Sequence, residues 1–102
     1  MLDKLIWMKW KTFSTLAQNK NFKVIEIDEN AVVIKVFGTG NVRSISMLRF
    51  DSAWKNLTQN GSLTQQEIYD TGTVNSAYIA TIIARIHNVT HTKNPIRLVY
   101  KK

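Results

Sequence analysis

The chain has 102 residues, of which 44% are hydrophobic, with no cysteine, one proline and a formal net charge of +7. This length fits one domain, and this composition excludes collagen-like, low-complexity and disordered chains, disulfide scaffolds and thiolate metal sites. No apolar run is long enough for a membrane span, and Lys9 and Lys11 interrupt the run that precedes them. We therefore expect a soluble cytoplasmic protein.

Residues 2–18 predict an amino-terminal helix, because apolar side chains recur on one broad face of a helical projection. That face carries Leu2, Leu5, Ile6, Phe13, Leu16 and Ala17, and it is widened by Trp7, Met8 and Trp10. Since one small core does not need so much apolar surface, Trp7 and Trp10 are candidate anchors for a protein partner or a second subunit. The alternatives are that they complete a crowded core, or that the lysine-flanked helix lies on a membrane surface.

A three-stranded antiparallel meander follows. Phe22–Ile27 and Ala31–Phe37 predict a hairpin around Asp28–Asn30, and the turn Gly38–Asn41 leads to a third strand at Val42–Ile45. The acidic residues of the first turn are better explained as a solvated turn than as a catalytic pair, and the glycine-rich second turn carries no phosphate-binding fingerprint. A helix is predicted after Ser46, and Asn60–Gly61 closes it. Its apolar residues at helical spacing are Phe50, Ala53, Trp54 and Leu57.

Two further helices are predicted in the last forty residues. Thr64 and Glu67 have the spacing of a capping box, and Gly72 suits the end of that short helix. The second helix begins at Asn75 or Ser76. An isoleucine stripe faces the core, which leaves a set of hydrogen-bonding residues nearer the outer face: Ser76, Tyr78, Thr81 and Arg85. A strand over residues 95–100 completes the chain.

Two helices joined by a glycine-bearing turn, and followed by a basic strand, resemble the helix-turn-helix and winged-helix motifs of DNA-binding proteins. The resemblance covers residues 62–100, about a third of the chain. It implies that the second helix enters the major groove of duplex DNA, and that the protein regulates transcription.

The distribution of charge agrees with this resemblance. No acidic residue follows Asp70, whereas five basic residues do. Clustered positive charge attracts phosphate backbones, although it also keeps a small protein soluble without a partner. The candidate nucleic-acid-binding residues are Asn75, Ser76, Tyr78, Thr81, Arg85, Lys93, Arg97, Lys101 and Lys102. The competing interpretation of these residues is a solvated helix face and tail.

Catalytic or metal chemistry is not predicted. His87 and His91 have a metal-binding spacing on a helix, but no third ligand is near them in the sequence, so surface histidines are the better interpretation. No nucleophile, base and orienting group can be assembled. We therefore expect no enzyme activity, no cofactor and no small-molecule substrate. The functional alternative to DNA binding is a protein-interaction or adaptor module that uses an exposed apolar helix or groove.

The predicted fold is a small α+β domain over residues 1–102. Residues 1–60 supply the amino-terminal helix, the meander and a helix, and residues 61–102 supply the helix-turn-helix-like unit with its carboxyl-terminal strand. The predicted core consists of Leu5, Ile6, Phe13, Ile25, Ile27, Ile34, Phe50, Trp54, Leu57, Ile68, Ile79, Ile83 and Leu98.

Overall fold

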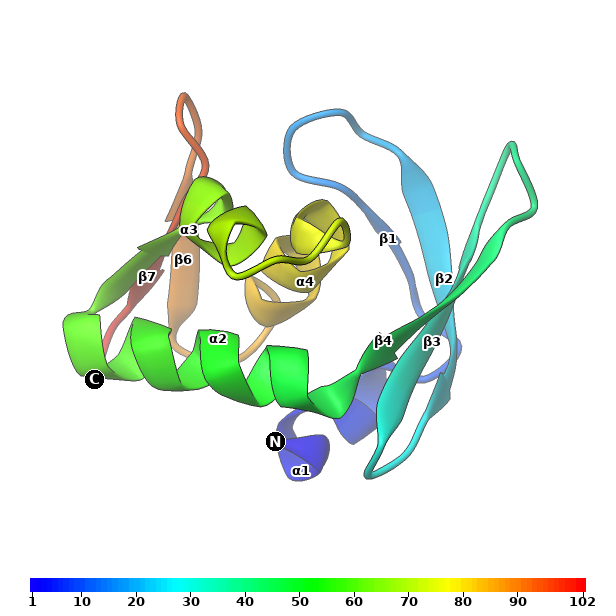
Figure 1. Cartoon of the computed structure of the whole chain (residues 1–102), viewed down its shortest axis with the longest axis horizontal. Coiled ribbons are helices and arrows are strands. Elements are labelled where there is room, and N and C mark those ends of the chain that lie inside the picture. Colours follow the sequence, from blue (N-terminus) through cyan, green and yellow to red (C-terminus); the bar gives the residue numbers. More distant parts are fainter.

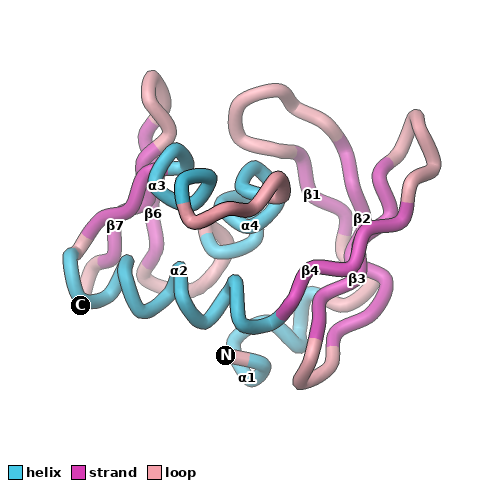
Figure 2. The backbone as a smooth tube through the Cα atoms, viewed as in Figure 1, coloured by secondary structure: helices cyan, strands magenta, loops and turns pink.

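Two antiparallel sheets stand apart, with helices between and beneath them (Figure 1). The computed structural model describes the whole chain, residues 1–102. The first sheet has the spatial order β1 (Thr12–Ser14), β2 (Asn21–Ile27), β3 (Ala31–Val36), β4 (Val42–Ser46). The second sheet has the order β5 (Ser62–Thr64), β7 (Arg97–Tyr100), β6 (Val89–Thr92). Figure 2 shows how the loops and helices separate the two sheets.

The amino terminus departs from the prediction of a helix over residues 2–18. Only α1 (Leu2–Leu5) and a turn of 3₁₀ helix, η1 (Ile6–Met8), are helical. Trp10 then takes a left-handed backbone conformation with φ of 71°, and the chain continues into β1. Strand pairing with β2 has overridden the helical periodicity here, and the β-branched and aromatic residues of β1 suit a strand.

The predicted meander is confirmed, and β1 adds a fourth strand to it. β2 pairs with β3 and β3 with β4, all antiparallel. Burial alternates along the strands, so that Phe22, Val24 and Ile34 point inward while Lys23 and Lys35 point to the other side. One face of this sheet therefore contributes to the core, and the opposite face is turned away from the helices (Figure 1).

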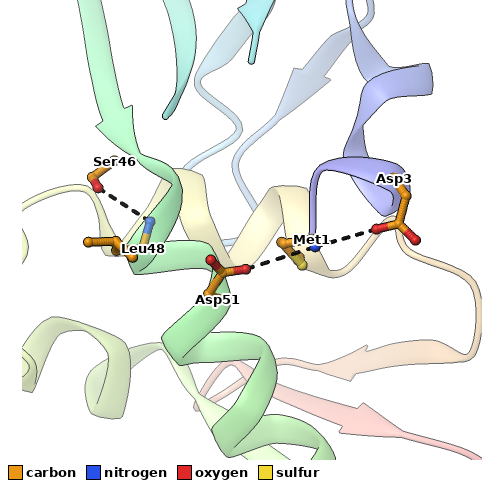
Figure 3. Close-up of polar contacts among 5 residues, drawn as sticks. All are labelled: Met1, Asp3, Ser46, Leu48 and Asp51. Carbon is orange, nitrogen blue, oxygen red and sulfur yellow. Dashed lines mark hydrogen bonds and ion pairs between the residues drawn. The ribbon is translucent and has the colours of Figure 1, made fainter. Parts of the chain in front are cut away.

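The predicted helix after Ser46 is α2 (Met47–Asn60). Its N-cap hydroxyl accepts a hydrogen bond from the Leu48 N–H at 3.3 Å, and Gly61 ends it with φ of 80°. Figure 3 shows this cap beside the amino group of Met1, which lies 3.4 Å from Asp3 and 4.0 Å from Asp51 of the same helix.

The two helices after α2 begin where the sequence predicted. Thr64 and Glu67 form the full capping box of α3 (Gln65–Asp70), and α4 (Ser76–Ile83) follows a turn in which Gly72 has φ of 99°. The strand predicted over residues 95–100 is β7. None of the helices is both long and apolar enough to cross a membrane.

One cluster of 25 buried side chains fills the space between the sheets. Most of the predicted core belongs to it: Leu5, Ile27, Ile34, Phe50, Leu57, Ile68, Ile79, Ile83 and Leu98. Phe13, Ile25 and Trp54 are only partly buried. The prediction for Ile6 is wrong, since 49% of its surface is exposed, because the short 3₁₀ turn directs it outward.

Candidate nucleic-acid interface

The carboxyl-terminal half, from α2 onward, contains the three helices and the carboxyl-terminal strand that the sequence predicted, together with β5 and β6, which it did not predict. α2, β5, α3 and α4 are followed by the hairpin of β6 and β7, and β7 lies between β5 and β6. Residues 93–95 of the hairpin loop are exposed. This loop stands clear of the helices in Figure 1, and we call the β6–β7 hairpin, residues 89–100, the wing.

The outward placement predicted for α4 is wrong. Ser76 and Tyr78 are 7% and 8% exposed, and Thr81 is completely buried. The reason is tertiary: α2 and α3 pack against α4, and β1 of the first sheet also contacts it. A helix that is amphipathic in isolation is therefore buried on all sides.

Specific contacts join α4 to the first sheet and to the loop between β1 and β2. The hydroxyl of Thr81 accepts a hydrogen bond from the Leu16 N–H at 3.2 Å and donates one to the carbonyl of Ala77 at 2.8 Å. The ring of Tyr78 meets Phe22 edge to face, with 5.2 Å between centroids. The polar residues that were expected to approach base edges instead connect the two halves of the molecule.

Asn75 takes part in the same contact between halves. Its side-chain oxygen accepts a hydrogen bond from Arg43 at 3.1 Å, and the Arg43 guanidinium lies 5.5 Å from the centre of the Tyr78 ring. Arg43 belongs to β4, so a basic residue from the meander lies beside the start of α4. Sequence reasoning gave Arg43 no role, because nothing in its local pattern indicates a partner 32 residues away.

The other predicted binding residues are exposed. Arg85 follows α4 and lies over the Phe13 ring at 5.8 Å, while Arg97 donates a hydrogen bond to the Ser62 hydroxyl at 3.3 Å. Backbone bonding from Lys101 N–H to the Asn88 carbonyl at 2.8 Å holds the start of the basic tail beside β6. The exposed basic residues after Asp70 are therefore Arg85, Lys93, Arg97, Lys101 and Lys102.

Very little of the positive charge is neutralised within the fold. Of the fourteen lysine and arginine side chains, Lys9 alone forms an ion pair, with Glu26 at 3.2 Å. The other two ion pairs involve the amino group of Met1. Basic side chains on both halves thus face solvent without a carboxylate partner, and they are available to external anions.

The two candidate interface tryptophans are both exposed, but they lie in different surroundings. Trp7 is 52% exposed and borders a surface hollow that Lys4, Trp54 and His87 also line. Trp10 is 61% exposed, and the ammonium groups of Lys9 and Lys23 lie 5.3 and 5.6 Å from its ring centre. The basic surroundings of Trp10 were not predicted, since they depend on the pairing of β1 with β2.

No group of three or more His, Cys, Asp and Glu side chains is placed to hold a metal ion. His87 and His91 are exposed, and they do not share a helix, because α4 ends at Ile83 and His91 belongs to β6. The Asp28 carboxylate accepts hydrogen bonds from the N–H groups of Asn30 and Ala31 at 2.8 and 2.9 Å, so it stabilises the β2–β3 turn.

Comparison with known proteins gives no further guidance: no family model, no curated protein and no solved structure matches the chain. An interpretation of function must come from the side chains on its surface.

Proposed function

We propose that the protein is a small, non-enzymatic nucleic-acid-binding protein that holds duplex DNA by its phosphate backbone. The observation that carries the proposal is the set of five exposed basic residues after Asp70, because none of them forms an ion pair and no acidic residue occurs in this stretch. Lysine and arginine side chains that contact phosphates release condensed counterions, and this release supplies most of the affinity of such proteins. The proposal keeps the cytoplasmic location that the sequence favours.

The mode of binding differs from that of a groove-reading helix. Because α4 is buried, the wing and tail are the parts free to approach DNA, through Lys93, Arg97 and Lys101. Contacts of this kind set position and affinity but carry no sequence information. Transcriptional regulation is the use that the winged-helix resemblance implies, and base discrimination would then depend on Arg85 or on a partner.

Fluorescence anisotropy with a labelled random-sequence duplex, over a series of salt concentrations, tests this proposal. Replacing Arg97 and Lys101 by Gln is expected to weaken binding to all sequences, and to flatten the slope of log affinity against log salt by about 1.8. Replacing Lys20 and Lys55 is a matched control, because it removes the same charge from exposed positions outside the carboxyl-terminal hairpin.

Two results would overturn the proposal. The first is the absence of salt-dependent binding to any nucleic acid at micromolar protein in low salt. The second is an equal loss in the test variant and in the Lys20/Lys55 control, because binding would then follow net charge rather than this surface. Arg85→Ala adds a separate measurement: a loss of roughly 1–3 kcal/mol confined to some sequences would indicate base contact.

A protein-interaction module is the second candidate, and the observation that favours it is the exposure of Trp7 beside the hollow lined by Trp54 and His87. Large aromatic rings in such positions are common binding anchors. Trp7→Gln should then abolish capture of a partner, or self-association in sedimentation, while leaving nucleic-acid binding intact. A monomeric wild type from which no partner is lost on mutation would remove this candidate.

A further inference from the structure

The side of the first sheet turned away from the helices carries an ordered row of side chains. Thr12, Lys23, Lys35 and Val42 are directly opposite one another across all four strands. Phe37 continues β3 on the same side, because its N–H donates to the Asn21 carbonyl at 3.0 Å and the preceding Val36 is buried. We call this surface the outer sheet face, and it comprises Trp10, Thr12, Lys23, Lys35, Phe37 and Val42.

Trp10 is held on this face by an unusual backbone. Its N–H donates to the Val24 carbonyl at 2.6 Å, while the Val24 N–H donates to the Lys11 carbonyl at 2.9 Å. Trp10 and Lys11 therefore face the single residue Val24, which is a β-bulge. Trp10 occupies the first bulge position, whose positive φ is normally supplied by glycine. A tryptophan there is strained and 61% exposed, so the fold gains little core packing from it. Such strain is characteristic of binding sites.

The charges of the outer sheet face point to an anionic ligand. Lys23 and Lys35 are direct cross-strand partners, an arrangement of like charges that destabilises a sheet, and neither forms an ion pair. Lys9 and Lys11 lie on either side of Trp10 in the sequence, and the nearby Glu26 is already paired with Lys9. A phosphate placed at the Lys23–Lys35 pair would remove the repulsion between them.

We infer that the outer sheet face binds single-stranded nucleic acid. Exposed aromatic rings stack on unpaired bases, whereas lysines hold the phosphates between them, and a duplex keeps its base faces hidden. Trp10 and Phe37 lie on opposite sides of the lysine row, so a strand that crosses the row meets both rings and both charges. The inference rests on the proposed function, because both require nucleic acid, but it assigns a different surface and a different form.

Anisotropy titrations of the full chain with labelled oligothymidylate and oligouridylate, each about 15 nucleotides long, test the inference. Trp10→Gly is expected to weaken binding of these strands by roughly tenfold, the effect of losing one stacked base, and to leave duplex binding unchanged. Replacing Lys23 and Lys35 by Gln should flatten the salt slope by about 1.4. A bound strand that stacks on Trp10 should quench the fluorescence of this tryptophan. Trp10→Phe keeps an aromatic ring, so it should retain affinity and lose that quenching.

Matched controls separate this surface from the wing. Trp7→Gln removes an equally exposed tryptophan elsewhere, and the Arg97/Lys101 double variant removes the same charge from the wing and tail. Both should leave single-strand affinity unchanged. The oligothymidylate and oligouridylate arms show whether a 2′-hydroxyl contributes.

The outcomes distinguish the two proposals. Binding of neither duplex nor single strand overturns both. Retained nucleic-acid binding that Trp10→Gly and the Lys23/Lys35 variant do not alter overturns this inference alone. Displacement of a bound strand by polyaspartate as effectively as by an unlabelled oligonucleotide would assign the face to an acidic protein and would also overturn it.

Discussion

The two halves of the molecule follow local structural rules to different degrees. In the carboxyl-terminal half, α3 begins with a complete capping box at Thr64, α2 ends at the left-handed Gly61, and the turn after α3 has a left-handed glycine at 72. In the amino-terminal half, Trp10 occupies a position suited to glycine, and Lys23 faces Lys35. Departures from local consistency gather where proteins bind ligands. The difference therefore directs attention to the amino-terminal sheet, which sequence motifs alone did not highlight.

The largest expected effect tests whether the two halves form one cooperative unit. Phe22 of β2 is completely buried against Tyr78 of α4, so Phe22→Ala should lower the free energy of unfolding by about 3–5 kcal/mol. Trp54→Ala should have a smaller effect, because Trp54 is only partly buried. Urea denaturation followed by far-UV circular dichroism measures both. Two separate transitions in the wild type, with only one of them moved by Phe22→Ala, would contradict a shared core.

The next prediction concerns the hydrogen bond between the halves. Thr81→Val keeps the volume but leaves the buried Leu16 N–H without its acceptor, which should lower the free energy of unfolding by about 1–3 kcal/mol. Thr81→Ser retains the hydroxyl and serves as the matched control. The same denaturation assay applies, and equal loss in both variants would assign the effect to packing of the methyl group instead.

A third prediction sharpens the comparison within the well-capped half. Thr64→Ala removes the hydroxyl that accepts from the Glu67 N–H at 3.1 Å, and it should lower stability by about 0.5–2 kcal/mol. Hydrogen bonds from the Thr64 backbone N–H and hydroxyl lower the pKa of Glu67 below its ordinary value of 4.5. The stabilising contribution is therefore complete above pH 4.5, and it is lost as the pH falls through the lowered pKa.

The pH dependence has its own control. Glu67→Gln cannot titrate, so its stability should change less than that of the wild type between neutral pH and pH values below 4.5. Thermal unfolding at a series of pH values provides the measurement. Identical profiles for the two proteins would show that Glu67 does not contribute to acid sensitivity.

The smallest effect has an unusual sign. Trp10→Gly should leave stability unchanged or raise it by up to about 1 kcal/mol, because glycine takes the left-handed conformation without the penalty of a side chain. Gly61→Ala at a similar φ should instead destabilise the protein by about 1 kcal/mol, because a side chain is strained in this left-handed conformation. The added methyl group would meet only open space, so no new contact offsets the strain. A clear loss of stability in Trp10→Gly would mean that the ring supports the fold.

Sequence patterns predicted the longer helices and strands. They failed where contacts between residues distant in the sequence decide the structure. α2 and the capping box of α3 were predictable because their signals are local, as was the β2–β3 hairpin. β1, β5 and β6 have three or four residues each, too few to establish a period of two. The outward face of α4 was wrong because no local signal indicates that α2, α3 and β1 pack against it.

For the candidate surfaces, the sequence predicted the exposure of the basic and tryptophan residues but not how they are arranged in space. The exposed basic tail after Asp70 and the exposure of Trp7 and Trp10 agree with the sequence interpretation. The cross-strand row that aligns Lys23 with Lys35 depends on strand register, which a single sequence does not reveal. Lys23 and Lys35 each stand between two apolar residues of a predicted strand, a pattern that could have placed them on the face opposite the core but not beside each other.

The β-bulge at Trp10 also influences how copies of the molecule behave toward one another at high concentration. An exposed edge strand is a template on which further strands can add, and this addition is a common route to aggregation. Here the edge is short, is bent by the bulge and carries Lys9 and Lys11 on either side of the bulky ring. Incoming strands would meet like charge and a distorted hydrogen-bonding edge. The distortion that places Trp10 on the outer sheet face therefore also protects this edge from self-assembly.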